Sequence, residues 1–110
     1  MNFALIVAAG KGLRFGEEIP KQFLICKNYP ILYYTIKAFE QNDNINHIIL
    51  VTSPDYIELV KSYVIKYNLQ KVTKIVEGGS TRQISVFNGL KAIKEIAPKD
   101  SKVLIHDGAR

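Results

Sequence analysis

Four short runs rich in apolar residues, separated by segments with helical spacing, constrain the fold of this chain more than any other feature. The runs occupy residues 3–9, 47–52, 72–76 and 103–106, and their polar and apolar residues do not strictly alternate. Strands of this kind are typical of a sheet that is covered on both faces, and such sheets are mostly parallel. The four runs therefore predict a buried parallel sheet.

The segments between these runs predict helices. Pro30 suits the first position of a helix that ends before the polar residues 41–44. Ser53 is predicted to be the N-cap of a second helix, with Pro54 following at its first position. Residues 10–29 lack a sustained period and predict a long loop with one short helical turn. Loops of this length in compact domains are usually functional.

A third helix is predicted to start in a capping box formed by Ser80 and Gln83. Its core face is predicted to carry the apolar residues at helical spacing, which are Ile84, Phe87, Leu90, Ile93 and Ala97. Gly89 is expected to allow close packing between this helix and a strand. Because strands and helices alternate, the sequence predicts the α/β class: a doubly wound parallel sheet with helices on both faces.

Length and composition place the chain among single soluble domains. It has 110 residues and one cysteine, Cys26, which cannot form an internal disulfide. No apolar run approaches the roughly 20 residues that span a bilayer. A secretory signal requires a basic residue before its apolar run, and no basic residue precedes the first apolar run here. We therefore expect a cytoplasmic protein with no membrane segment.

The formal net charge of +5 is compatible with nucleic acid, an anionic membrane or a phosphorylated small molecule as partner. Several of the charges gather at a glycine-rich loop, and the others scatter over the predicted helices. A nucleic-acid-binding module would instead present a basic stripe on one face. The tyrosines at 33, 34, 56, 63 and 67 fall at packing positions rather than on a base-stacking platform. We therefore expect no nucleic acid partner.

Ligands of an open parallel sheet bind beyond the carboxyl ends of its strands, and the segments 8–21, 78–85 and 107–110 follow three of the predicted strands. The first is rich in glycine and contains Lys11, Arg14 and Lys21. It is not a P-loop, because no Gly-Lys-Ser/Thr ends it, and Phe15 stands where a dinucleotide fingerprint requires its third glycine. Three cations around a glycine loop suit a triphosphate. For Lys11, a solvated loop lysine stays an alternative.

Three sequence blocks together carry a resemblance to a known family. They are Ala8-Ala9-Gly10-x-Gly12-x-Arg14-x-Gly16 followed by Pro20-Lys21-Gln22, then Gly78-Gly79-x-x-Arg82-x-x-Ser85-Val86-x-Asn88-Gly89-Leu90, and His106-Asp107-Gly108-Ala109-Arg110. In this order and spacing they resemble the signature of the 2-C-methyl-D-erythritol 4-phosphate cytidylyltransferases. The resemblance covers the whole chain and about the first half of the family's protein. At Gly108, alanine is commoner in the family.

The resemblance implies a Rossmann-like fold of the nucleotide-diphospho-sugar transferase type, of which residues 1–110 are the CTP-binding part of a single larger domain. It implies transfer of a cytidylyl group from CTP to 2-C-methyl-D-erythritol 4-phosphate, with release of pyrophosphate, in non-mevalonate isoprenoid synthesis. Impaired activity is expected of the 110 residues alone. The complete protein is expected to be a homodimer. Ribitol-5-phosphate cytidylyltransferase is a neighbouring alternative, and an NAD-binding reductase domain is an alternative from another class.

The resemblance also assigns roles to single residues. Arg14 and Lys21 are implied to be catalytic, stabilising the five-coordinate α-phosphorus. The nucleotide-binding positions are implied to be Ala8, Ala9, Gly10, Lys11, Gly12, Gly79, Arg82, Ser85 and Asp107. Asp107 is also the implied ligand of Mg²⁺, which prefers phosphate oxygens together with one or two carboxylates. For Arg82, contact with the ligand and an internal ion pair are both left open, and His106 is expected to be a hydrogen-bonded scaffold residue.

Overall fold

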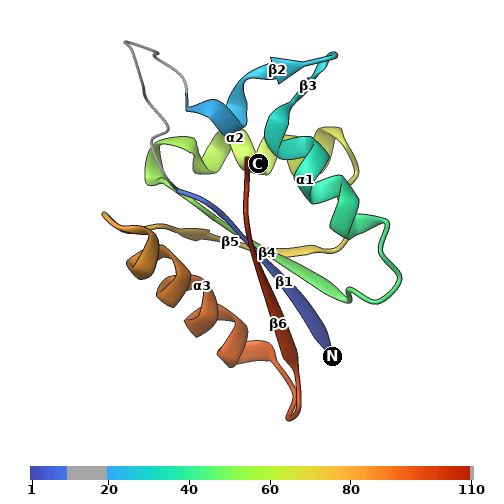
Figure 1. Cartoon of the computed structure of the whole chain (residues 1–110), viewed down its shortest axis with the longest axis vertical. Helices are drawn as coiled ribbons and strands as arrows, with labels where there is room; N and C mark the ends of the chain where they lie inside the picture. The colour runs from blue at the N-terminus through green and yellow to red at the C-terminus, as the bar shows by residue number, and fades with distance from the viewer. Residues whose placement is uncertain (10–19, 110) are drawn as a thin grey trace.

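The computed structural model of the chain describes residues 1–9 and 20–109, and its centre is a four-stranded sheet. The strands are β1 (Asn2–Ala8), β4 (His47–Thr52), β5 (Val72–Glu77) and β6 (Lys102–Asp107), and each neighbouring pair is parallel. Their order is β5-β4-β1-β6 (Figure 1). The chain therefore winds outward from β1 in both directions, which is the topology of doubly wound sheets.

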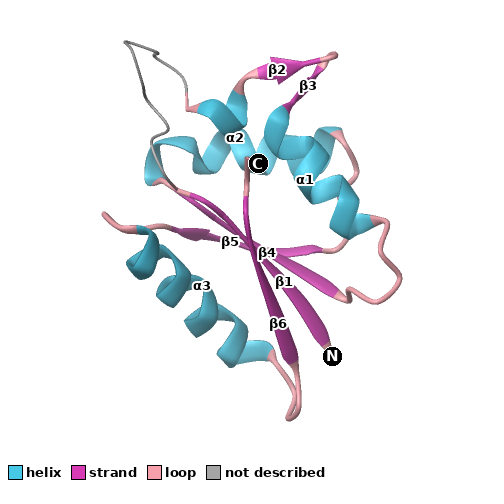
Figure 2. Cartoon of the chain, in the orientation of Figure 1, coloured by secondary structure: helices cyan, strands magenta, loops and turns pink. Residues whose placement is uncertain are grey.

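Helices cover both faces of this sheet, as predicted (Figure 2). The helices α1 (Ile31–Glu40) and α2 (Ile57–Lys66) pack on one face, against alternate residues of β1 such as Ala4 and Ile6. The helix α3 (Arg82–Ile96) packs on the other face, where β1 contributes Phe3 and Leu5. Because successive side chains of a strand point to opposite faces, β1 supplies both halves of the core. No helix in the described ranges is long and apolar enough to cross a bilayer.

Two helix starts differ slightly from the sequence prediction. Pro30 has an extended backbone conformation and is the N-cap of α1, so the helix begins one residue later than predicted. Ser53 does precede a proline at N1, but the element it begins is a 3₁₀ turn, η2 (Pro54–Tyr56), which leads into α2. Both prolines therefore mark a helix start, although neither residue fixes the position to better than one turn.

The start of α3 corrects the predicted capping box of Ser80 and Gln83. The N-cap is Thr81, whose hydroxyl oxygen accepts a hydrogen bond from the backbone N–H of Ile84 at 3.1 Å. An N-cap side chain accepts from the second or third helical N–H, so a shift of one residue also removes Gln83 from the reciprocal position. Two adjacent hydroxyl residues made the sequence ambiguous at this point.

The buried face of α3 is also not the predicted one. Ile84, Phe87 and Leu90 are 43%, 63% and 38% exposed. The buried residues are mostly small, namely Ser85, Gly89, Ala92 and Ile93, and of the predicted face only Ile93 belongs to them. The helix lies so close to the sheet that a Cβ on Gly89 would be 2.4 Å from Leu5 Cδ1. Close approach selects small residues, and this requirement overrides hydrophobic periodicity here.

The strand β6 was predicted to be buried and is instead at the edge of the described sheet. It pairs with β1 on one side, and Val103, Leu104 and Ile105 are 37%, 52% and 40% exposed. Val103 and Ile105 lie opposite Phe3 and Leu5 in the register and share their face, whereas Leu104 lies on the face of α1. Apolar composition therefore predicted the strand but not its place in the order.

A short hairpin precedes α1 and was not predicted. After the 3₁₀ turn η1 (Lys21–Phe23), β2 (Ile25–Cys26) pairs antiparallel with β3 (Tyr29–Pro30). The turn residues Lys27 and Asn28 have φ of 49° and 77°, as a two-residue hairpin turn of the primed type requires. The predicted helical turn corresponds to η1, but a Lys-Asn turn lacks the usual glycine signal. The rest of the predicted loop, residues 10–19, lies outside the described residues.

Aromatic rings connect this hairpin to the helices. Tyr29 stacks on Tyr33 with ring centroids 4.3 Å apart, and both contact Tyr67 of the segment that ends α2. Tyr34 donates a hydrogen bond from its hydroxyl to the backbone oxygen of Cys26. Burial raises the pKa of the Tyr63 phenol, and the electrostatic interaction with the neighbouring Tyr67 raises it further. The tyrosines therefore serve packing, as their spacing predicted.

The close approach of α3 gives a test at Gly89. Substituting alanine for an exposed glycine within a helix usually stabilises the protein, by up to about 1 kcal/mol. At Gly89 the new methyl group would also lie 2.9 Å from Val51 Cγ2, so we expect Gly89→Ala to lower the free energy of unfolding by about 1–3 kcal/mol. Urea denaturation measures this, with Lys91→Ala on the exposed side of α3 as control. A stabilised Gly89→Ala variant would contradict the described packing.

Candidate functional site

A cavity of about 640 Å³ opens at the carboxyl edge of the sheet. Residues at the ends of the four strands or directly after them line it, from the ranges 7–9, 53–55, 78–82 and 107–109. Lys21 and Gln22 of η1 close another side. The carboxyl ends of parallel strands thus form one concave site, at the position expected for ligands of an open α/β sheet.

The cavity brings together most of the site residues that the sequence predicted. Those that line it are Ala8, Ala9, Lys21, Gly79, Arg82, Ser85 and Asp107. Four other predicted residues, Gly10, Lys11, Gly12 and Arg14, lie outside the described residues. Residues from three segments that are far apart in the sequence therefore meet at one site, whereas their contacts with a ligand stay predictions.

The glycine pair after β5 forms one wall and is held closely. Gly78 donates its N–H to the backbone oxygen of Thr52 at 2.7 Å, and a Cβ at Gly78 would lie 2.3 Å from that of Ala9. Gly79 donates its N–H to Ser85 Oγ at 3.0 Å. Ser85 is 1% exposed, so its hydroxyl supports the loop from below. A backbone wall without side chains allows a planar ligand to approach closely.

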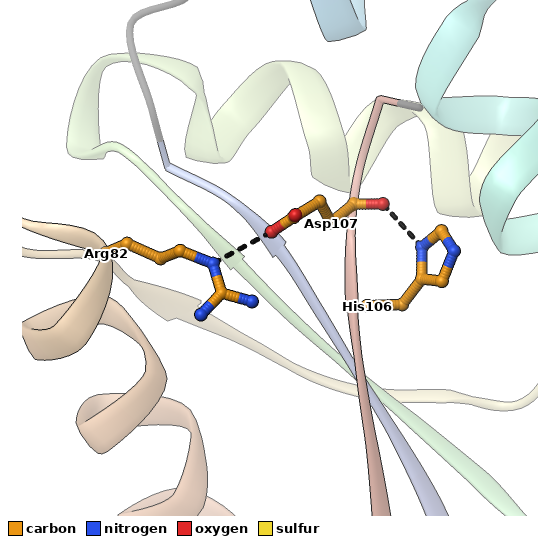
Figure 3. A network of polar contacts seen from close by, with 3 residues as sticks. All are labelled: Arg82, His106 and Asp107. Carbon is orange, nitrogen blue, oxygen red and sulfur yellow. Dashed lines mark hydrogen bonds and ion pairs between the residues drawn. The ribbon is translucent and has the colours of Figure 1, made fainter.

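Arg82 and Asp107 span the cavity from the start of α3 to the end of β6 (Figure 3). Arg82 Nε donates to Asp107 Oδ1 at 3.0 Å, and the two side chains are 58% and 28% exposed. Of the two roles left open for Arg82, the structure therefore contains the internal ion pair. A pair with this exposure contributes little to stability, so its arrangement matters more for the charge of the site than for folding.

His106 lies on the opposite side of β6 from this ion pair, as Figure 3 shows. Its Nδ1 is 2.6 Å from the backbone oxygen of Asp107, and its ring contacts Phe39 of α1 with centroids 5.6 Å apart. Thr35 of α1 donates its hydroxyl to the backbone oxygen of Gly108 at 3.0 Å. His106 is therefore hydrogen-bonded as predicted, its scaffold role stays a prediction, and α1 supports the end of β6 from behind.

Gln22 is a site residue to which sequence analysis gave no role. It is 6% exposed, and its Nε2 donates to the backbone oxygen of Ala8 at 2.9 Å. The hydroxyl of Thr52 donates to the same oxygen at 3.5 Å. The available signal was its place in the block Pro20-Lys21-Gln22, which marks the position but does not separate a buried amide from a solvated one.

Metal ligands are sparse at this site. Within residues 1–9 and 20–109, no group of three or more His, Cys, Asp or Glu side chains could hold a metal ion. The cavity does contain the carboxylate of Asp107. Mg²⁺ is usually bound by one or two carboxylates together with substrate phosphates, so this donor set fits Mg²⁺ that arrives with a phosphorylated ligand.

The strand order, with its topological switch between β1 and β6, and the cavity at the carboxyl edge define a Rossmann-like α/β fold with a candidate ligand site. A family model described as 2-C-methyl-D-erythritol 4-phosphate cytidylyltransferase matches residues 2–110. The chain therefore belongs to the 2-C-methyl-D-erythritol 4-phosphate cytidylyltransferase family. Membership confirms the resemblance seen in the three sequence blocks.

Individual relatives agree with this assignment. The chain is 54% identical over 110 residues to a cytidylyltransferase of this name from Clostridium botulinum, and 44% identical to one from Lachnospira eligens. These alignments cover 99% and 100% of the chain but 46% and 47% of the relatives. The crystal structure of 4-diphosphocytidyl-2C-methyl-D-erythritol synthase from Anaerococcus prevotii matches with a TM-score of 0.74 and 31% identity, covering 97% of this chain and 42% of that one. The chain thus spans about half the length of its relatives.

The start of α3 places Arg82 and Ser85 at the cavity, and its N-cap gives a second test. Thr81→Ala removes the oxygen that accepts from Ile84, so we expect the free energy of unfolding to fall by about 1 kcal/mol. Ser80→Ala, one residue earlier, is the matched control and should change it by less than about 0.5 kcal/mol. Urea denaturation of both variants measures the difference. The reverse ranking would restore the capping box at Ser80.

Proposed function

We propose that residues 1–110 are the CTP-binding part of a single larger domain that transfers a cytidylyl group from CTP to 2-C-methyl-D-erythritol 4-phosphate. The observation that carries this proposal is the cavity that joins Ala8 and Ala9, Lys21, Gly78 and Gly79, and Asp107 at one sheet edge. Family membership favours this acceptor over ribitol 5-phosphate and over an NAD-binding reductase domain. The pathway proposed is the non-mevalonate synthesis of isoprenoids.

The proposed reaction needs no nucleophile from the protein. A phosphate oxygen of the acceptor attacks the α-phosphorus of CTP and forms the new P–O bond. The bond from that phosphorus to the oxygen of the β-phosphate breaks, and pyrophosphate leaves with the electron pair. Negative charge grows on the phosphoryl oxygens during this step, so cations aimed at them lower the barrier. Lys21 of η1 is proposed as one of these cations, and its position in the lining of the cavity supports this role. Arg14 is proposed as the second cation.

The nucleotide itself is proposed to lie between the two glycine-containing walls. Ala8, Ala9 and Gly79 offer backbone at close range, and Ser85 holds the Gly79 loop in place. Gly10, Lys11 and Gly12 are proposed to continue the first wall, on the strength of the family's sequence block alone. Small residues at these positions favour backbone hydrogen bonds to the base, the ribose and the phosphates.

Mg²⁺ is proposed to be held by Asp107 together with oxygens of the triphosphate. When bound, the ion supplies positive charge that neutralises the phosphates. Arg82 pairs with Asp107 at 3.0 Å, so this arginine can hold the carboxylate in place before the nucleotide arrives and can contact a phosphate afterwards.

The complete protein is proposed to be a homodimer, as the family resemblance implies. It is also proposed to be cytoplasmic and to bind no nucleic acid, as the composition and the distribution of charge predict. Because the chain spans 46% of a relative's length, we infer that these 110 residues bind CTP weakly and catalyse the reaction poorly. Full turnover by the chain alone, measured as pyrophosphate release from CTP and the acceptor, would contradict this inference.

Calorimetric titration with CTP and Mg²⁺ tests the proposed function. We expect binding to the chain, and a loss of about tenfold or more in Lys21→Ala, because a charge-assisted hydrogen bond contributes about 1.5–3 kcal/mol. Lys94→Ala, which removes an exposed lysine near the far end of α3, is the matched control and should bind as the unmodified chain does. Equal affinity of Lys21→Ala, or binding of NADH in place of CTP, would overturn the proposal.

A further inference from the structure

We propose that Gln22 is a positioning residue for this reaction, whose side-chain amide fixes the turn carrying Lys21 to the carboxyl end of β1. The inference rests on the proposed function, in which Lys21 acts on the triphosphate. It assigns to Gln22 no contact with the nucleotide. Its effect is on where the ammonium group of the preceding residue can lie.

The first observation is the burial of a neutral amide at the site. Gln22 is 6% exposed, and its Nε2 donates to the backbone oxygen of Ala8 at 2.9 Å. Glutamine is mostly found at the surface, and a buried polar group costs free energy unless it is hydrogen-bonded. Its burial here therefore indicates a requirement for the bond rather than a tolerance of the residue.

The second observation is the geometry of η1, in which three successive residues point in different directions. Lys21 is exposed and lines the cavity, whereas Gln22 and Phe23 are buried. Phe23 stacks on Tyr56 with ring centroids 4.5 Å apart. The turn is thus held by a polar contact at Gln22 and an apolar contact at Phe23. Of these two, the Gln22 contact is the one directed to a strand that lines the cavity.

The third observation is what else meets at the oxygen of Ala8. Thr52 Oγ1 donates to it at 3.5 Å, and the backbone oxygen of Thr52 accepts from Gly78 at 2.7 Å. The ends of β1 and β4 and the start of the Gly78–Gly79 wall are therefore connected through two adjacent carbonyl groups. Gln22 attaches the turn of Lys21 to this same group of contacts, so the cation and the nucleotide walls keep one fixed spacing. Catalysis by positioned charges is sensitive to such spacing.

Substitutions at Gln22 can test the hydrogen-bond donor separately from the size and shape of the side chain. Gln22→Met keeps the length of the side chain and removes the donor. Gln22→Glu keeps the shape and places a carboxylate against the oxygen of Ala8, which repels it at neutral pH. Gln22→Asn is a milder variant, since its amide is one methylene too short to reach the same oxygen. The matched control is Gln70→Met, at an exposed glutamine whose Nε2 contacts Asn68.

The decisive measurement compares the affinity for CTP with that for cytidine, both with Mg²⁺, in the chain and in these variants. Gln22→Met should weaken CTP binding about tenfold, the equivalent of one lost buried hydrogen bond, and should change cytidine binding less than about twofold, because cytidine has no phosphate for Lys21 to contact. Gln22→Glu should lose more, and Gln70→Met nothing. In the double variant with Lys21→Ala, the Gln22 substitution should add no further loss. Equal losses for CTP and cytidine, or additive losses in the double variant, would overturn the inference.

Amide hydrogen exchange without nucleotide provides a test that does not depend on CTP. The N–H groups of Phe23 and Leu24 donate to Pro20 and Lys21 within η1, and in Gln22→Met they should exchange about tenfold faster, while the amides of β4 keep their protection. If Gln22→Met does not fold, Gln22→Asn is read in the same way. Absence of CTP binding to the unmodified chain would refute the proposed function alone. Unchanged exchange of η1 would refute the role of Gln22.

Discussion

The hydrogen bonding of β1 to a parallel strand on each side is the constraint on which the structure depends. β1 pairs with β4 and with β6, so its backbone groups are satisfied without water and its side chains can be buried on both faces. Parallel pairing also brings every carboxyl end to the same edge. The chain leaves each strand at this edge, and the segments that follow the strands line the site together with residues of η1 and α3.

Much of this arrangement could be predicted from the sequence, because apolar runs and helical spacing report burial directly. Which face of a single helix or strand is buried could not be predicted in the same way. In α3, Phe87 and Leu90 suggested a core face, yet Gly89 and Ala92 are buried, because the helix lies too close to the sheet for bulky side chains to fit between them. The position of β6 was equally inaccessible, since composition identifies a strand without giving its order in the sheet.

The candidate site shows the same division. Lys21, Arg82 and Asp107 were predicted as site residues because they stand in the three sequence blocks that resemble the family, and for Arg82 an internal ion pair was left open as well. The relations among these residues depend on strand order: Arg82 and Asp107 are 25 positions apart in the sequence and form an ion pair. The support of Gly79 by Ser85 and of Ala8 by Gln22 likewise involves buried polar groups, for which residue type alone carries almost no signal.

The exposed strand β6 also affects how these 110 residues behave in solution. In the described sheet, β6 pairs with β1 on one side only, and its central residues are apolar on both faces. The charged residues that discourage further strand pairing stand at its two ends, Lys102 and Asp107. Val103, Leu104 and Ile105 are therefore where another polypeptide, including a second copy of the chain, can most easily add a strand.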